Sequence, residues 1–185
     1  MRRPLAAAFV CLATLTACSS SEGGAATPQS TTESTSPTSS STRPREIRLD
    51  GKNPCDLMTA EQLAAIAETT TPKLSTVDTF KSPSCNFNTN GAFWTITTVV
   101  TEGIDAWTSG KRNGRPADIP AIAGFPSITV TLPTDKVACD LAVDVADGQY
   151  LFAGFEVSES FADRFPKPCD GARQVAEAAM QNLTK

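Results

Sequence analysis

Residues 137–157, which read VACDLAVDVADGQYLFAGFEV, contain two runs in which apolar side chains recur at every second position. That period is typical of strands with one buried face, and Asp147-Gly148 between the runs is a turn signal. A two-residue turn would set Leu151 against Asp144, whereas a three-residue loop with Gly148 in a G1 bulge keeps the apolar side chains on one face. This second register pairs Val143 with Leu151, Leu141 with Ala153 and Cys139 with Phe155. We therefore predict an antiparallel hairpin with Cys139 on its core side.

A helix is predicted after the connection that follows this hairpin. Asp170, in Pro168-Cys169-Asp170, is a good N-cap residue. Apolar residues then recur with helical spacing at Ala172, Val175, Ala176, Ala179 and Leu183. Because most of these side chains are small, the helix can lie close against the sheet, and Cys169 in its first turn is brought near Cys139.

The cysteines predict two disulfides. Of the six in the chain, Cys11 and Cys18 belong to the N-terminal leader considered below, which leaves Cys55, Cys85, Cys139 and Cys169. An even number in an exported domain indicates disulfides, although four cysteines allow three pairings. The predicted hairpin and helix favour Cys139–Cys169, and Cys55–Cys85 follows by elimination.

A second helix start surrounds Cys55. Asn53-Pro54-Cys55-Asp56 precedes Thr59 and Gln62, which have the spacing of a capping box. Cys85 opens the first region with strand character. The second bridge, like the first, is thus expected to tie the start of a helix to the start of a strand.

The other segments complete an α+β fold. Strands are predicted at residues 92–101 and 125–132, which are rich in β-branched and aromatic side chains. The end of a strand and a turn are predicted at residues 85–91. A short helix is predicted at residues 104–110. We expect an antiparallel sheet of about five strands, with N- and C-terminal helices packed on it.

The N-terminus has the pattern of a signal peptide. Arg2 and Arg3 precede an apolar run from Leu5 to Leu15, which is too short to span a bilayer core of about 30 Å. Leu15-Thr16-Ala17-Cys18 resembles a bacterial lipobox, which implies that residues 1–17 are removed and that Cys18 carries lipid. The alternative is an ordinary secretory peptide. We expect a protein anchored at the extracytoplasmic face of the cell membrane through acyl chains on Cys18.

A linker separates this anchor from the folded part. Residues 19–44 contain nine Ser, six Thr and three Pro in 26 residues, a composition that cannot bury enough apolar surface to offset chain ordering. We expect residues 18–44 to be a disordered tether, bare or O-glycosylated, and residues 45–185 to form a single domain.

Composition excludes several classes of function. The 185 residues include no His, which removes imidazole bases and His-based nucleophilic or zinc sites. The formal net charge of −4 and the pI near 4.9 argue against a nucleic-acid partner. No pattern of catalytic, metal-ligating or cofactor-binding residues is present, so we expect no cofactor and no enzymatic activity.

Three groups of residues were weighed as sites. Residues 111–115, Lys-Arg-Asn-Gly-Arg, form the one basic cluster and could contact an anionic glycolipid, but the Asn-Gly turn signal favours a solvated loop. Asp140 and Asp144, with Asp147 at the turn, are expected on the solvated face of the hairpin rather than around a metal. Trp94 and Trp107 are expected in or near the core.

The spacing of these features resembles that of a known family. Asn53-Pro54-Cys55-Asp56-Leu57-Met58-Thr59, Cys85, Ala138-Cys139 and Cys169 with Ala172 are similar to a family of actinobacterial secreted lipoproteins that carry a domain of unknown function. The resemblance covers residues 50–183. It departs at residues 122–126, Ile-Ala-Gly-Phe-Pro, where many members have a glycine-rich turn. The family implies a location but supplies no catalytic or binding residues.

These features together predict a membrane-anchored, non-enzymatic module that binds or senses a cell-envelope component, with an envelope protein or a glycolipid as partner. A carrier of a lipid or other apolar ligand is the alternative, and it requires an interior cavity of several hundred Å³. A hydrolase that uses carboxylates or Ser and Lys is the third hypothesis.

Overall fold

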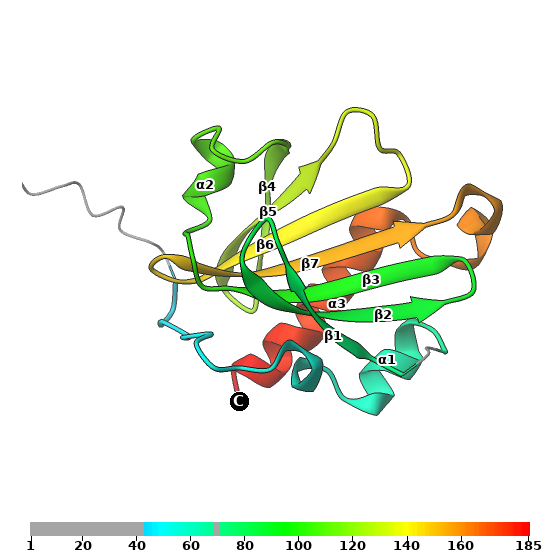
Figure 1. Ribbon diagram of the computed structural model, residues 1–185, viewed down its shortest axis with the longest axis horizontal. Coiled ribbons are helices and arrows are strands. Elements are labelled where there is room, and N and C mark those ends of the chain that lie inside the picture. Colours follow the sequence, from blue (N-terminus) through cyan, green and yellow to red (C-terminus); the bar gives the residue numbers. More distant parts are fainter. Residues whose placement is uncertain (1–42, 69–70) are drawn as a thin grey trace, which may run out of the picture. The chain divides into compact units, whose positions relative to one another are not determined.

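The computed structural model describes residues 43–68 and 71–185 (Figure 1). The expected signal peptide 1–17, the lipidated Cys18 and nearly all of the expected linker lie outside the described residues. Within the described part, no helix is both long and apolar enough to cross a membrane.

A seven-stranded antiparallel sheet, in the order β1-β2-β3-β7-β6-β5-β4, forms the centre of the fold. Its strands are β1 (Lys73–Val77), β2 (Ser82–Thr89), β3 (Ala92–Val99), β4 (Arg115–Ile122), β5 (Phe125–Thr131), β6 (Ala138–Ala146) and β7 (Gln149–Val157). The helices are α1 (Ala60–Ile66), α2 (Asp105–Thr108) and α3 (Pro168–Leu183), with 3₁₀ turns η1 (Pro54–Leu57) and η2 (Glu159–Arg164). The α+β class is confirmed, but the expected number of about five strands is wrong.

The two strands that the sequence analysis missed lie at the edges of the sheet. β1 is short and mostly exposed, so it lacks the alternation of a half-buried strand. β4 contains Pro116 and Pro120 and has an irregular register between Ile119 and Ile122, which are features typical of edge strands. Edge strands bury few side chains, and the hydrophobic pattern therefore indicates them weakly.

The central hairpin has the predicted register. Val143 lies opposite Leu151 and Cys139 opposite Phe155, and a register shift follows Asp144. Gly148 has a φ of 70°, in the left-handed region that a G1 bulge requires and that glycine adopts without strain.

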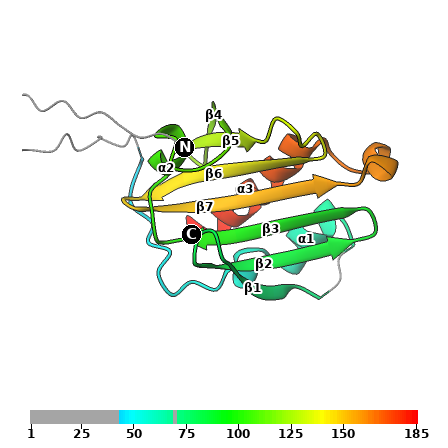
Figure 2. The same cartoon turned by 45° about the horizontal axis from the view of Figure 1, so that its top comes forward.

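Helix α3 packs across β6, β7 and β3 on one face of the sheet, and α1 lies on the same side (Figure 2). The residues of α3 that face the sheet are fully buried: Ala172, Val175, Ala176, Ala179 and Met180. A Cβ added to Gly171 would lie 2.4 Å from the ring of Phe155, so the first turns of α3 contact the sheet closely. Phe155 in turn stacks on Trp94, with ring centroids 5.7 Å apart.

The opposite face of the sheet carries a second apolar cluster. Phe80, Trp107, Tyr150 and Phe152 form its aromatic part, and Trp107 comes from α2. Phe152 stacks on Trp107 with centroids 5.7 Å apart, and Phe80 meets Phe152 edge to face at 5.1 Å. Both tryptophans are therefore core residues, but the core is divided between the two faces of the sheet.

The structure joins Cys55 to Cys85 and Cys139 to Cys169, the pairing that the sequence favours. Thr59 and Gln62 form the expected capping box at α1. The expected N-cap at Asp170 is wrong, because α3 begins at Pro168, which needs no hydrogen bond for its nitrogen at a helix start. Asp170 instead lies in the first turn, where its charge still favours the helix.

The folded part begins before the expected boundary at residue 45. The Arg43 side chain is only 8 % exposed and forms ion pairs with Asp144 and Asp147 at the β6–β7 turn. Asp144 and Asp147, two of the three carboxylates expected on the solvated face, thus form ion pairs with the segment that leads into the domain.

Candidate functional site

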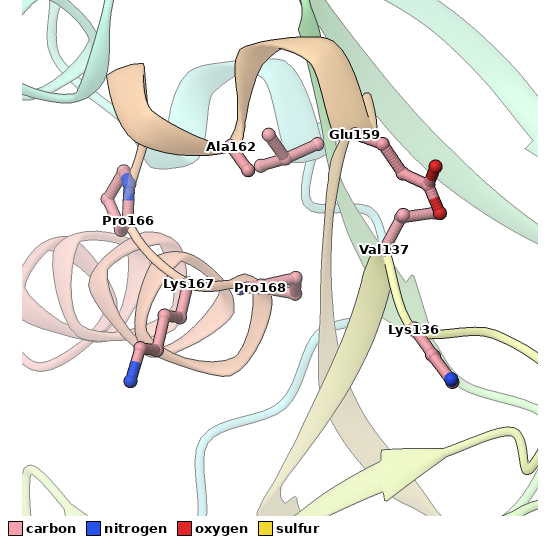
Figure 3. Close-up of a pocket in the computed structure, with 8 residues that line it drawn as sticks. Lys136, Val137, Glu159, Ala162, Pro166, Lys167 and Pro168 are labelled. Atoms are coloured by element: carbon pink, nitrogen blue, oxygen red, sulfur yellow. The ribbon is translucent and has the colours of Figure 1, made fainter.

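The clearest candidate site is a surface pocket of about 250 Å³ between η2 and the start of α3. Its remaining wall comes from the two residues before β6, Lys136 and Val137, and from the end of β7 (Figure 3). The lining is mainly apolar, with charged side chains at the opening, and consists of Lys136, Val137, Val157, Glu159, Ala162, Pro166, Lys167 and Pro168. We call this the η2–α3 pocket.

Rigid elements position the walls of the η2–α3 pocket. Phe161 of η2 lies so close to Gly91 that a Cβ there would be 2.3 Å from the Phe161 ring, and Phe161 N–H donates to Ser158 C=O at 2.8 Å. The disulfide between Cys139 and Cys169 links the β6 wall to the α3 wall, with the two Cα atoms 4.9 Å apart. The pocket is therefore formed by covalent and close-packed contacts.

The charge around the pocket is mainly positive. Lys136 and Lys167 are exposed, and among residues 43–68 and 71–185 neither ammonium group has a carboxylate within 4.0 Å. Figure 3 shows the Lys136 and Lys167 side chains at the rim, extending away from each other, and Glu159 beside Val137. The N-terminus of α3 adds partial positive charge, and Lys167 at the N-cap contributes no side-chain cap. An apolar hollow with a cationic opening suits a ligand that has an apolar body and an anionic end.

Asp140 occupies a different environment from the one expected. It projects from β6 over Gly154 of β7, where an added Cβ would lie 2.7 Å from Asp140 Oδ1 and 3.0 Å from Thr95 Oγ1. Burial, with a smaller contribution from the negative charges of Asp135 and Glu156, raises the pKa of Asp140 to about 6. Asp140 lies on the face of the sheet opposite α3, the outer face that the sequence predicts, but its neighbours on the sheet remove it from much of the solvent.

Among the described residues, no three potential His, Cys, Asp or Glu ligands come together. Asp144 and Asp147 both pair with Arg43, whereas Asp140 lies beside Gly154 and Thr95.

The basic cluster at residues 111–115 is not simply a solvated loop. Lys111 Nζ lies 2.9 Å from Glu102 Oε2, and Arg112 Nε donates to Glu102 Oε1 at 2.6 Å. The Glu102 side chain is only 4 % exposed and also accepts a hydrogen bond from Tyr150 at 3.1 Å. Two of the three basic residues thus hold the connection after α2 against the sheet, and the cluster loses much of its suitability for a glycolipid. Glu102 stands alone among apolar and small residues, and no sequence pattern indicated its role.

Comparison with known proteins identifies a family for nearly the whole chain. A family model described as "Protein of unknown function (DUF3558)" matches residues 13–182. The chain belongs to the DUF3558 family. No curated protein and no solved structure matches the chain significantly. Membership in this family carries no assigned activity, so the functional argument depends on the geometry of the site.

No ligand-binding residue could be assigned from the sequence. The η2–α3 pocket combines residues near 136, 157 and 167, which come together only because the Cys139–Cys169 bridge and the β6–β7 hairpin place them side by side. The one local signal is Pro166-Lys167-Pro168, a rigid segment that presents a lysine immediately before a helix.

Proposed function

We propose that this protein is a lipid-anchored, extracytoplasmic, non-enzymatic binding module, and that the η2–α3 pocket is its ligand site. One observation carries the site assignment: an apolar pocket is bordered by two lysines, Lys136 and Lys167, that have no ion-pair partner among the residues described. The anchor is supported by the lipobox-like end of the leader at Cys18 and by the polar tether that follows it.

The ligand of the pocket is a small anionic group attached to a short apolar segment. A volume of about 250 Å³ accommodates a few carbon atoms rather than a whole lipid. Such a group occurs on anionic envelope glycolipids and on the side chains or C-termini of envelope proteins, and these are the two partner classes that we propose.

A carrier of a large apolar ligand receives less support from the geometry. The space between α3 and the sheet is occupied by close contacts such as Gly171 on Phe155 and Phe155 on Trp94. The pockets described lie at the surface, and none belongs to this interface.

The ligand class can be tested with hexanoate and hexanol, which share an apolar body and differ in charge. We expect the full-length mature protein to bind hexanoate about 3- to 10-fold more tightly than hexanol by calorimetry, since exposed charge pairs contribute modestly. The double variant Lys136→Gln/Lys167→Gln should lower hexanoate affinity to that of hexanol. Lys73→Gln, at an exposed lysine on the far edge strand, is the matched control and should leave both affinities unchanged. Equal binding of both probes by the unmodified protein would rule out the anionic ligand class.

The anchor requires a separate experiment. Cys18→Ser should release the protein into the medium or leave its precursor uncleaved, because no thioether-linked lipid can form. Membrane association of a matured Cys18→Ser protein would contradict the anchoring proposal without affecting the pocket.

A further inference from the structure

The two disulfides of the domain close chain loops of the same length. In each bridge the cysteines are 30 residues apart in sequence and their Cα atoms are 4.9 Å apart. The loss of chain entropy that each bridge imposes on the unfolded state is therefore nearly the same. Any difference in how easily the bridges open with the domain folded must come from their surroundings.

Those surroundings differ in the access that they give to an attacking thiolate. Cys85 is fully buried in β2, and its partner Cys55 is half-buried in η1. In the other bridge, Cys139 is 1 % exposed on β6, but Cys169 is exposed to solvent in the first turn of α3. Thiol–disulfide exchange requires direct contact with one sulfur, so this asymmetry favours the second bridge.

The charges near Cys169 suit the second step of exchange, in which Cys169 leaves as a thiolate. A cysteine in the first turn of a 16-residue helix is stabilised as a thiolate by the helix dipole, and Lys167 two residues earlier adds positive charge. Asp170 opposes this effect from the next position.

We propose that Cys139–Cys169 is a thiol–disulfide exchange site, that Cys169 is the cysteine attacked, and that the reductant is a dithiol protein of the oxidoreductase class. One thiolate of the dithiol forms a bond to Cys169 Sγ while the bond between Cys169 and Cys139 breaks. The electron pair passes to Cys139 Sγ, which takes a proton from water. The second thiolate of the dithiol then attacks the first sulfur of the same dithiol, which is bonded to Cys169, and the two form a disulfide. The Cys169 thiolate is released, so that two electrons have moved from the dithiol to the bridge.

The fold tolerates the opening of this bridge. Ala172, Val175 and Met180 of α3 are fully buried, and Gly171 lies directly on Phe155. These contacts keep α3 on the sheet after reduction. The freed segment is the junction from Lys167 to Cys169, which forms one wall of the η2–α3 pocket, so exchange would also change ligand affinity. Only this change in ligand affinity rests on the proposed function.

Graded reduction of the native full-length protein tests the exchange site. The protein is treated with increasing dithiothreitol at pH 8, alkylated, and each cysteine is quantified by peptide mass spectrometry, while circular dichroism monitors folding. We expect Cys139 and Cys169 to become labelled at a dithiothreitol concentration on the order of tenfold lower than Cys55 and Cys85, because Cys55 is half-buried and attack on Cys85 must await local opening of the sheet. Equal labelling of both bridges, earlier labelling of Cys55–Cys85, or labelling only as the helical signal is lost would overturn the proposal.

A pair of single variants tests which cysteine is accessible. Cys139→Ser leaves Cys169 free, and Cys169→Ser leaves the buried Cys139 free. Iodoacetamide should label Cys169 in the first variant at least about tenfold faster than Cys139 in the second, because the buried sulfur reacts only after local opening. Similar rates would contradict attack at Cys169, and neither measurement involves the pocket ligand.

Discussion

Replacement of Gly171 by Ala tests how closely the first turns of α3 pack against the sheet, next to Pro168 of the η2–α3 pocket. The added Cβ would lie 2.4, 2.6 and 2.7 Å from three carbons of the Phe155 ring. Carbon atoms at van der Waals contact are about 3.5–4.0 Å apart, so the helix or the ring must move by about 1 Å. Phe155 has little freedom to move, because it is 2 % exposed and stacks on Trp94.

Two opposing effects set the magnitude of this change. Overpacking of a dense core costs about 1–3 kcal/mol, whereas alanine is favoured over glycine inside a helix by about 1 kcal/mol. We expect Gly171→Ala to lower the free energy of unfolding by up to about 2 kcal/mol. A matched pair at an exposed position of the same helix, Gln174→Ala and Gln174→Gly, measures the preference of the helix for Ala over Gly alone. The Ala variant should have the higher free energy of unfolding, by about 1 kcal/mol.

Urea unfolding of the four proteins, followed by tryptophan fluorescence, provides the assay. A Gly171→Ala protein that is more stable than the unmodified protein by about 1 kcal/mol, the full difference shown by the Gln174 pair, would refute the close contact of α3 with the sheet.

Three other substitutions probe separate parts of the domain. The pKa of Asp140 is raised from 3.8 to about 6 in the folded state. Between about pH 4 and pH 6, the folded protein therefore holds a proton that the unfolded chain has released. The free energy of unfolding falls as the pH rises through this window. Asp140→Asn should flatten that part of the profile and stabilise the protein at pH 7 by about 1–3 kcal/mol, which chemical denaturation at several pH values would measure. Glu102→Ala should cost about 3 kcal/mol in the same assay, because it leaves Arg112 and the Tyr150 hydroxyl without their shared acceptor; a loss below 0.5 kcal/mol, on the scale of an exposed pair, would contradict the role given to Glu102. Thr59→Ala should lower stability by about 1 kcal/mol through loss of the capping box of α1, and an unchanged urea midpoint would show that this cap contributes nothing.

The sequence predicted the parts of the fold that depend on strong local periods. The alternation in residues 137–157 specified the β6–β7 register, and the spacing of Ala172, Val175, Ala176 and Ala179 specified the buried face of α3. The disulfide pairing followed from these two elements, because together they bring Cys139 and Cys169 close in space.

Features that depend on distant segments were not predictable in this way. β1 and β4 bury too few side chains to give a clear period. The burial of Asp140 depends on neighbours from β3, β7 and the segment before β6. The η2–α3 pocket joins residues 136–137 to residues 157–168 through a turn and a bridge, and its chemistry is visible only once these are folded together.

The central claim is that a ligand with an apolar body and an anionic end binds in the η2–α3 pocket. Titration of the ¹⁵N-labelled full-length mature protein with hexanoate, followed by amide chemical shifts, tests its location most directly. The account predicts saturable shifts concentrated at Val137, Ala162 and Lys167 on the walls of the pocket, and their loss in Lys136→Gln/Lys167→Gln. Saturable shifts confined to another part of the domain, or no saturable shift at all, would contradict the account.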